Sequence, residues 1–398
     1  MRVSTFTMHQ SALDAMLAQQ ASLSRTQNQI STGRRIQTAA DDPAAAVHVL
    51  ELQRALAAAE QHKSNAINAK NRINLEETTL ADATNVLQRV RELALRANSG
   101  IVDNATRSLF AAEIRSRLDE FMSMANRQDV NGDYLFSGYA SGTQPFARPA
   151  NGAVQYQADS GERQQVIAPG QKVADGHSGD KVFVKVPEGN GAFVATYAAT
   201  NTGTGVLGVG TVVDRSLWDR GTYSVNFTAP GSYEVRDSAN TLVTSGAYQS
   251  GTAIAFRGIS FSLTGAPAAG DRFTVRPAAS ESIFATLDKL VSLTSTPTAN
   301  VADQAKLNSD LTAVLQQLSQ GIDHMGSVRA EVGSRLSAID VADEARDAFG
   351  VENQRLLSEL QDVDYAEAVT RMNRQLLSLQ AAQSSYSRLA QLSLFNYL

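Results

Sequence analysis

The sequence predicts an α+β multidomain protein, in which a long coiled-coil-like helical bundle is built from both chain ends and an antiparallel β-domain is inserted between them. Of the 27 Gly residues, 21 lie between Gly132 and Gly270, together with most of the nine Pro residues. Turns need these residues, and helix interiors tolerate them poorly. Apolar residues recur every seven positions in both outer thirds of the chain, whereas apolar and polar residues alternate in the middle third.

Three domains are expected from this layout. A terminal helical domain combines residues 1–40 with 366–398, and a long-helix bundle domain combines residues 41–140 with 281–365. Residues 141–280 form the inserted β-rich domain. Because the chain leaves the helical part and later returns to it, its two ends can meet in one bundle.

Composition narrows the class of protein. The chain has 398 residues, of which 43% are hydrophobic, and a formal net charge of −5, with no basic patch for nucleic acid. The absence of Cys excludes disulfides, thiolate metal sites and Cys nucleophiles. Met1–Gln20 lacks the apolar run of a secretory signal, and no stretch of about 18 apolar residues predicts a membrane span.

The longest predicted helix begins at Asp42-Pro43, an N-cap acid followed by a Pro whose missing N–H costs nothing in the first turn. It ends at Asn98-Ser99-Gly100. Heptad rows with many small residues are typical of a close-packed coiled-coil seam. One row comprises Leu52, Ala59, Ala66, Ile73, Leu80, Leu87 and Ala94, and a second row, three residues on, is interrupted by His62 and Glu76.

Two further helices are expected beside it. In the last third of the chain, Leu311, Leu318, Met325, Val332 and Ile339 keep the heptad spacing, although Gly321, Gly326 and Gly333 weaken that helix. A helix over Ala105–Ala125 presents one apolar face: Leu109, Phe110, Ile114, Leu118 and either Phe121 or Met122. The predicted bundle seam is Leu52, Ile73, Leu80, Leu87, Leu318, Val332 and Ile339.

The outermost segments are nearly uncharged, and each carries one apolar stripe. Neither segment could bury enough surface to be a stable helix alone. Such segments are typical of helices that order when they pack against partners, although periodicity alone favours an ordinary internal helix pair. The predicted assembly interface is Leu13, Leu17, Leu23, Ile30, Val369, Met372, Leu376, Leu379, Tyr386, Leu389 and Leu392.

In the middle third, alternation predicts strands at 181–186, 222–227, 233–235, 253–263 and 272–275, separated by turn sequences such as Pro230-Gly231. We expect a sandwich or a partly open barrel. A carbohydrate platform is a possible use of its aromatic residues, but a core is the commoner one. The predicted core is Trp218, Tyr223, Phe227, Tyr233, Phe256, Phe261 and Phe273.

No pattern of residues points to catalysis, to a cofactor or to a metal. Gly203, Gly205 and Gly208 match GxGxxG, but a strand-like segment follows where a nucleotide site needs a helix. The five His residues lack ligand spacing. The acid pairs Glu76-Glu77 and Asp343-Glu344 are interpreted as solvated helix faces. We therefore expect a protein that is not an enzyme.

Both ends of the chain resemble bacterial flagellins. Residues 30–36 read ISTGRRI, residues 40–45 read ADDPAA and residues 87–95 read LQRVRELAL, as in the amino-terminal segment of that superfamily. Residues 362–369 read DVDYAEAV and resemble the carboxy-terminal segment. The resemblance covers about 1–140 and 280–398, and the middle matches no flagellin feature.

Within this superfamily the chain is most similar to the hook-associated proteins of the hook–filament junction. The sequences NGDYLFSG at 131–138 and YQADSGER at 156–163 carry this similarity, together with residues 393–398. The β-rich insert is longer than the similarity leads one to expect.

The resemblance implies a structural protein that joins hook to filament, is exported by the flagellar type III apparatus and offers a surface on which flagellin assembles. Its implied partners are flagellin, the proximal hook-associated protein, an export chaperone that holds the carboxy-terminal helices, and further copies in a homo-oligomeric ring. The terminal helices would form the polymerisation domain, and the β-domain would face outward. In flagellins an innate immune receptor binds the region that matches Arg89 and Leu93, which makes such recognition a hypothesis here.

Two alternatives to the junction protein remain open. A filament flagellin would polymerise by itself into long filaments. A surface adhesin would bind glycans through residues 141–280.

Overall fold

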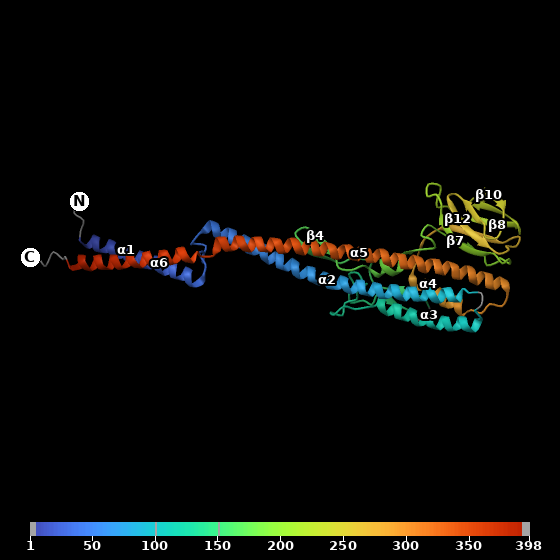
Figure 1. Ribbon diagram of the computed structural model, residues 1–398, viewed down its shortest axis with the longest axis horizontal. Coiled ribbons are helices and arrows are strands. Elements are labelled where there is room, and N and C mark those ends of the chain that lie inside the picture. Colours follow the sequence, from blue (N-terminus) through green and yellow to red (C-terminus); the bar gives the residue numbers. More distant parts are fainter. Residues whose placement is uncertain (1–4, 100–101, 150–151, 392–398) are drawn as a thin grey trace, which may run out of the picture. The chain divides into compact units, whose positions relative to one another are not determined.

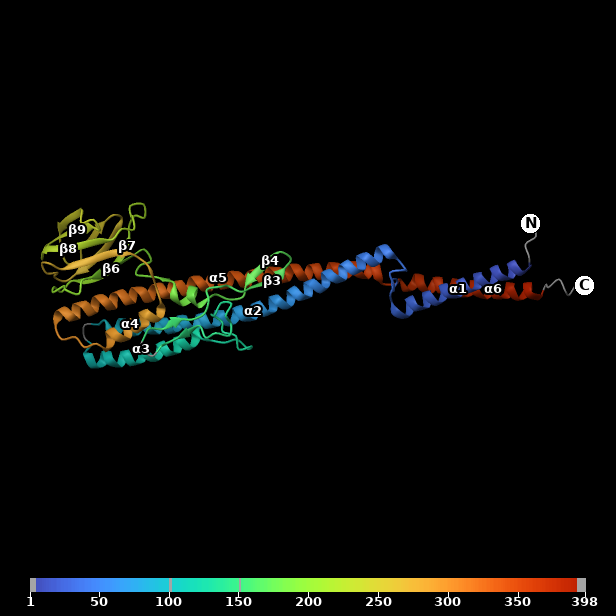
Figure 2. The same ribbon diagram turned by 180° about the vertical axis from the view of Figure 1, so that it is seen from behind.

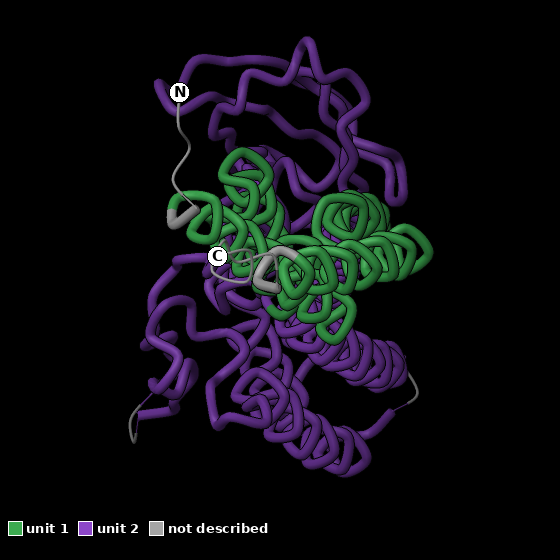
Figure 3. Tube along the Cα trace, turned by 90° about the vertical axis from the view of Figure 1, so that its left-hand side faces the viewer, with its two compact units in different colours: residues 1–64, 341–398 green, residues 65–340 purple. Residues whose placement is uncertain are grey.

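The computed structural model describes residues 5–99, 102–149 and 152–391. The chain divides into two compact units, one made of residues 1–64 with 341–398 and the other of residues 65–340 (Figure 3). The predicted fold class, helical chain ends with an inserted antiparallel β-domain, is confirmed (Figure 1). The finer division into three domains is not tested by these two units and stays a prediction.

The first unit contains the two terminal helices, α1 (Thr5–Thr32) and α6 (Tyr365–Gln391), which lie side by side (Figures 1 and 2). Asp364 precedes α6, and its carboxylate accepts a 3.1 Å hydrogen bond from the amide of Glu367. In the loop after α1, the Asp41 carboxylate accepts hydrogen bonds from the amides of Gln37 and Thr38. Side chains of this kind satisfy the free N–H groups of loops and first helical turns.

Two long helices, α2 (Pro43–Ala97) and α5 (Val301–Gln361), contribute residues to both units. The predicted start of α2 is confirmed, because the Asp42 carboxylate accepts a 3.1 Å hydrogen bond from the amide of Ala45. Within the second unit the helices run in opposite directions. Lys70 of α2 lies 2.6 Å from Asp340 of α5, measured between Nζ and Oδ1, and Glu77 pairs with the earlier Arg329 at 2.6 Å.

Two shorter helices, α3 (Asn104–Ala125) and α4 (Ile283–Ser295), pack against each other in the second unit. Asp103 and Ser282 are their N-caps. The predicted apolar face of α3 is confirmed at Ile114, Leu118 and Phe121, which are buried. It is wrong at Leu109, which is exposed. An aromatic core links α3 and α4 to the segment between them, with ring centroids 4.9 to 6.1 Å apart: Phe121, Phe136, Phe146, Phe183 and Phe284.

The segment between α3 and the β-domain is built from short pieces. Its strands are β1 (Phe146–Ala147), β2 (Gln155–Tyr156), β3 (Gln164–Ala168), β4 (Gln171–Ala174) and β5 (Val186–Pro187), the last paired with β14 (Ser280–Glu281). The strand predicted over 181–186 is wrong, since Asp180–Val184 forms a single π-helical turn, η1. Its consecutive residues Val182 and Phe183 are both buried, whereas neighbours on a strand point to opposite faces.

The inserted domain has two antiparallel sheets that share one hydrophobic core. The five-stranded sheet has the order β10-β9-β8-β13-β6, and the three-stranded sheet has the order β11-β12-β7. The strand bounds are β6 Phe193–Tyr197, β7 Val206–Val212, β8 Tyr223–Ala229, β9 Ser232–Asp237, β10 Leu242–Ala247, β11 Ala253–Phe256, β12 Ile259–Thr264 and β13 Arg272–Pro277.

The predicted aromatic core is confirmed in its main part. Tyr223, Phe227, Phe256, Phe261 and Phe273 are buried, and Trp218 and Tyr233 pack against them in partly buried positions. The strand predicted over 253–263 is in fact the hairpin of β11 and β12. Arg257 and Gly258 both have positive φ, 46° and 74°, which makes the tight turn.

Within the described ranges, every helix is either too short or too polar to cross a membrane.

Candidate assembly interface

Segments from opposite ends of the chain pair where α1 ends and α6 begins. The amide of Arg35 donates a 2.6 Å hydrogen bond to the carbonyl of Gln361, and the amide of Val363 donates one of 2.9 Å to the carbonyl of Gly33. Arg34 and Asp362 form the antiparallel bridge between these two bonds. The main chain therefore sets the register of α1 against α6.

Gly33 is suited to this pairing by its conformation. Its φ is +71°, in the left-handed region that side chains disfavour. A Cβ atom at this position would also lie 3.0 Å from the hydroxyl of Tyr365. The sequence motif around Gly33 is thus explained by the close approach of the two chain ends.

Polar and aromatic contacts continue along the helix pair. Gln375 of α6 donates a 2.8 Å hydrogen bond to the hydroxyl of Ser22 on α1. His9 and Tyr386 meet edge to face with ring centroids 5.7 Å apart. These contacts hold the two helices together without covering all of their apolar side chains.

The predicted interface residues whose side chains the structure describes fall into three groups. Leu23 is buried within the first unit, and five others are half-buried: Ile30, Met372, Leu376, Leu379 and Tyr386. Leu13, Leu17 and Val369 remain exposed. Leu392 and the side chain of Leu389 lie outside the described residues.

Sequence reasoning missed two exposed apolar residues of the same helices. Met8 and Leu377 lie off the predicted stripes, and Leu377 is 67% exposed, more than the 56% of Leu17. The helix pair therefore leaves several large apolar side chains exposed.

The predicted bundle seam is buried at six of its seven positions: Ile73, Leu80, Leu87, Leu318, Val332 and Ile339. Leu52, in the first unit, is half-buried. The interpretation of Glu76 as part of a solvated face is wrong, because Glu76 is buried. Leu93, which matches the receptor-binding region of flagellins, is buried as well, and Arg89 beside it is paired with Glu113 at 2.8 Å.

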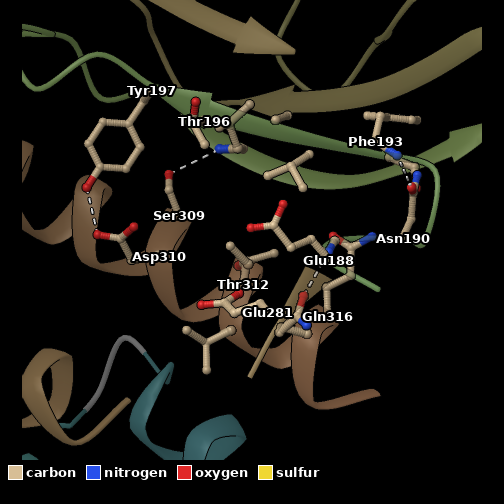
Figure 4. Close-up of a pocket in the computed structure, with 18 of the residues that line it drawn as sticks. Glu188, Asn190, Phe193, Thr196, Tyr197, Glu281, Ser309, Asp310, Thr312 and Gln316 are labelled. Carbon is tan, nitrogen blue, oxygen red and sulfur yellow. Dashed lines mark hydrogen bonds between the residues drawn. The ribbon is translucent and has the colours of Figure 1, made fainter. Parts of the chain in front are cut away.

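Polar side chains of α5 hold the β-domain within the second unit (Figure 4). The hydroxyl of Tyr197 donates a 2.7 Å hydrogen bond to Asp310, and the Ser309 hydroxyl accepts one of 3.1 Å from the amide of Leu207. The Gln317 side chain holds the segment that leads from β5 into the domain. It accepts a hydrogen bond from the backbone amide of Gly189 at 2.8 Å and donates one to the carbonyl of Pro187 at 3.2 Å.

A cavity of about 520 Å³ lies in this joint, lined by β6, β7, α4 and α5. Burial, followed by the hydrogen bond to Asp310, raises the pKa of Tyr197, and burial raises the pKa of the Glu281 carboxyl. The hydrogen bond from Arg276 lowers the pKa of Glu188. Among the described residues, no group of three or more His, Asp or Glu side chains could hold a metal ion.

Family models match both helical ends of the chain. The model of the bacterial flagellin N-terminal helical region matches residues 3–141, and that of the C-terminal helical region matches residues 312–398. A model of the D2-like domain of flagellar hook-associated protein 1 matches residues 196–277, within the β-domain.

Whole-chain comparisons are more specific. The chain is 24% identical to flagellar hook-associated protein 3 of Escherichia coli K12 over 99% of both chains. It is 36% identical to the FlgL crystal structure from Xanthomonas campestris, with a TM-score of 0.72, covering 77% of this chain and 99% of that one. The chain belongs to the FlgL family. The FlgL structure from Legionella pneumophila, 28% identical with a TM-score of 0.72 over 79% of this chain and 99% of that one, is described as a flagellar junction protein.

Membership of the FlgL family confirms the predicted function class and location: a structural protein of the flagellum at the hook–filament junction. Its relatives are flagellar structural proteins, and hook and filament components are the partners that this class implies. FlgL and hook-associated protein 3 are two names for the same family. The NGDYLFSG sequence at 131–138 indicates membership of this family.

Proposed function

We propose that this FlgL protein joins hook to filament through its paired terminal helices, whose exposed apolar residues form the contact surface for other subunits. The observation that carries this proposal is the state of the predicted interface. Leu13, Leu17, Val369 and Leu377 stay exposed although α1 and α6 are already paired. Apolar side chains that a stable helix pair leaves uncovered gain free energy when a further helix covers them, at about 25 cal/mol per Å².

We further propose four partners for this surface and for the chain that carries it. Flagellin and the proximal hook-associated protein would contact the assembled protein on its two sides, and further copies would complete a homo-oligomeric ring. An export chaperone would hold the carboxy-terminal helices before assembly. Terminal helices that are marginal alone suit a chain that folds after export.

The proposal assigns the protein no catalysis and gives the β-domain an outward-facing structural role. The match of residues 196–277 to a domain of hook-associated protein 1 favours a hook-associated protein over a filament flagellin. The adhesin alternative loses its main argument, because Tyr223, Phe227 and Phe273 are buried in the core of the β-domain and present no platform to a glycan.

The test is complementation of a strain that lacks its own FlgL, with the full chain carrying Leu17→Glu and Leu377→Glu together. We expect the variant to be exported and folded but to leave cells without filaments, measured by motility and by electron microscopy. The matched control is Leu109→Glu on α3, an equally exposed leucine of the second unit. Normal filaments on cells that carry the double variant would contradict the proposed surface.

Immunogold labelling with antibody against residues 141–280 tests the position of the wild-type protein. A single narrow band where hook meets filament is expected. Label along the whole filament would show a flagellin instead.

A further inference from the structure

Glu76 places a carboxylate in the apolar seam of α2. It stands in the heptad row between Ala69 and Ala83, both buried, and its side chain is only 2% exposed. Within the described part of the chain, its Oε2 atom has no hydrogen-bond partner. Its Oε1 atom accepts two hydrogen bonds from His177, one from ring Nδ1 at 2.8 Å and one from the backbone amide at 3.2 Å. A buried carboxylate is strongly destabilising unless a counter-charge lies beside it.

The imidazole of His177 lies between carboxylates of two different helices. Its side chain is fully buried, at 0% exposure, and its Nε2 atom lies 3.1 Å from Oε2 of Glu331 on α5. A carboxylate accepts hydrogen bonds, and an imidazole donates from both ring nitrogens only when both carry a proton. Each ring nitrogen of His177 therefore lies within hydrogen-bond distance of a carboxylate oxygen, the arrangement in which a doubly protonated ring can donate on both sides.

The other charged groups around His177 are already paired. Lys181 lies 2.6 Å from Glu331, and Arg335 of α5 donates to the carbonyl of Gly176 at 3.1 Å and to Glu162 at 3.0 Å. Arg72, one helical turn before Glu76, pairs with Asp129 at 2.6 Å. The Nε atom of Arg72 has no hydrogen-bond partner among the described residues, so His177 is the group of this cluster that hydrogen-bonds the Glu76 carboxylate.

His177 belongs to a segment that we call the strap, residues 162–184, which contains β3, β4 and η1. The strap contacts both long helices of the second unit. The side-chain Nδ2 of Asn65 on α2 donates to the carbonyl of Val166 at 3.0 Å, and the His324 ring of α5 lies 2.9 Å from the carbonyl of Lys181. The strap therefore depends on both helices at once.

We infer that His177 is held as an imidazolium that staples the strap across α2 and α5. Glu76 and Glu331 come together only when these two helices have paired in the native register. The staple can therefore form only when the two helices are paired in that register, and it holds the strap onto the pair. This role belongs to the second unit and does not depend on the proposed assembly surface.

The protonation state of His177 is measured by ¹⁵N NMR of the full chain labelled at histidine, at neutral pH. His177→Gln identifies the His177 signals by their loss. We expect both ring nitrogens of His177 to show a directly bonded proton. One unprotonated ring nitrogen, which would place the shared proton on a carboxyl or leave the imidazole neutral, overturns the assignment.

The stapling role is measured by hydrogen exchange in the full chain carrying Glu76→Gln, which keeps the shape of the side chain but removes its charge. We expect protected amides of the β3–β4 ladder and η1 to exchange about tenfold faster or more, while seam amides of α2 and α5 keep their protection. The matched control is Glu77→Gln, the next carboxylate of α2, which pairs with Arg329 of α5. It should leave the strap unchanged.

His177→Gln provides a second variant, located on the strap, in case Glu76→Gln fails to fold. It should release the strap in the same selective way. Unchanged strap exchange in the variants, or equal acceleration in strap and seam, overturns the staple.

Discussion

The backbone amide of Arg35 lies 2.6 Å from the carbonyl oxygen of Gln361, and this hydrogen bond joins segments that stand near opposite ends of the chain. The Arg35 side chain adds a second bond, 2.7 Å from Nη2 to the carbonyl of Leu360. Main-chain bonds of this kind fix register independently of side-chain rotamers. The exposed apolar residues of α1 and α6 are therefore held in a fixed register along the helix pair.

Gly33→Ala should disturb this junction. The alanine would carry a φ of +71° and a Cβ atom 3.0 Å from the Tyr365 hydroxyl. We expect a loss of about 1–2 kcal/mol in the free energy of unfolding of the first unit. Urea denaturation followed by circular dichroism measures the change.

Gly326→Ala is the control for that substitution. Gly326 lies inside α5, and an added Cβ atom would meet nothing within 4 Å. The alanine should stabilise the helix by up to about 1 kcal/mol, since glycine is a poor helix former. Equal destabilisation by both alanines would show that the conformation of Gly33 has no special role.

Leu87→Ala should be among the more destabilising substitutions in the seam of the second unit. Leu87 is 0% exposed, and its Cδ1 atom would lie 3.9 Å from a Cβ atom placed on Gly321 of α5. Removal of such a leucine costs about 2–5 kcal/mol because a cavity remains. The midpoint of thermal unfolding reports the loss.

Leu95→Ala tests whether burial is the cause of the destabilisation expected for Leu87→Ala. This leucine lies two turns later on α2 and is 50% exposed. The expected loss is below about 1 kcal/mol. A loss of stability as large as that of Leu87→Ala would contradict the assignment of Leu87 to the buried seam.

Gln317→Ala should loosen the β-domain. The change removes both hydrogen bonds to the entering strand and leaves the amide of Gly189 without its acceptor. An unsatisfied amide costs about 1–3 kcal/mol when buried. Trp218, the one tryptophan of the chain, lies in the β-domain, so its fluorescence during urea denaturation reports the effect. Gln316→Ala alters the preceding residue, which lines the same cavity, and should change the urea midpoint little.

The helical ends were accessible from sequence because they rest on local rules. Three signals act within a single helix: the scarcity of Gly and Pro, the Asp42-Pro43 start and the seven-residue spacing of apolar residues. The helices α2 and α5 form where these signals predict them. The flagellin-like motifs are also visible in the sequence, but their structural role is not. That Gly33 meets Tyr365 depends on a contact between chain ends, which no local pattern contains.

The failures of sequence reasoning have the same origin. Glu76 interrupts a row of apolar residues, which is a sign that its carboxylate is buried. Its partner His177 lies about a hundred residues away in an irregular segment, so the sequence does not show the pair. Val182 and Phe183 lie in a stretch whose alternation of apolar and polar residues predicts a strand. The aromatic core around Phe121 and Phe284 instead draws both inward, and this tertiary packing outweighs the local preference.

Acid should weaken the joint of the β-domain through Glu188. Its carboxylate accepts hydrogen bonds from Arg276 at 2.6 and 3.1 Å and from the amide of Ala279 at 3.0 Å. The bond from Arg276 lowers the pKa of Glu188 below its ordinary value of 4.5. A depressed folded-state pKa gives a stabilisation that is present above the ordinary value and is lost as the pH falls through the folded one. The difference in urea midpoint between wild type and Glu188→Gln, followed by Trp218 fluorescence, should therefore shrink below about pH 4.5. A difference that stays constant down to acid pH would mean that Glu188 acts by packing rather than by charge.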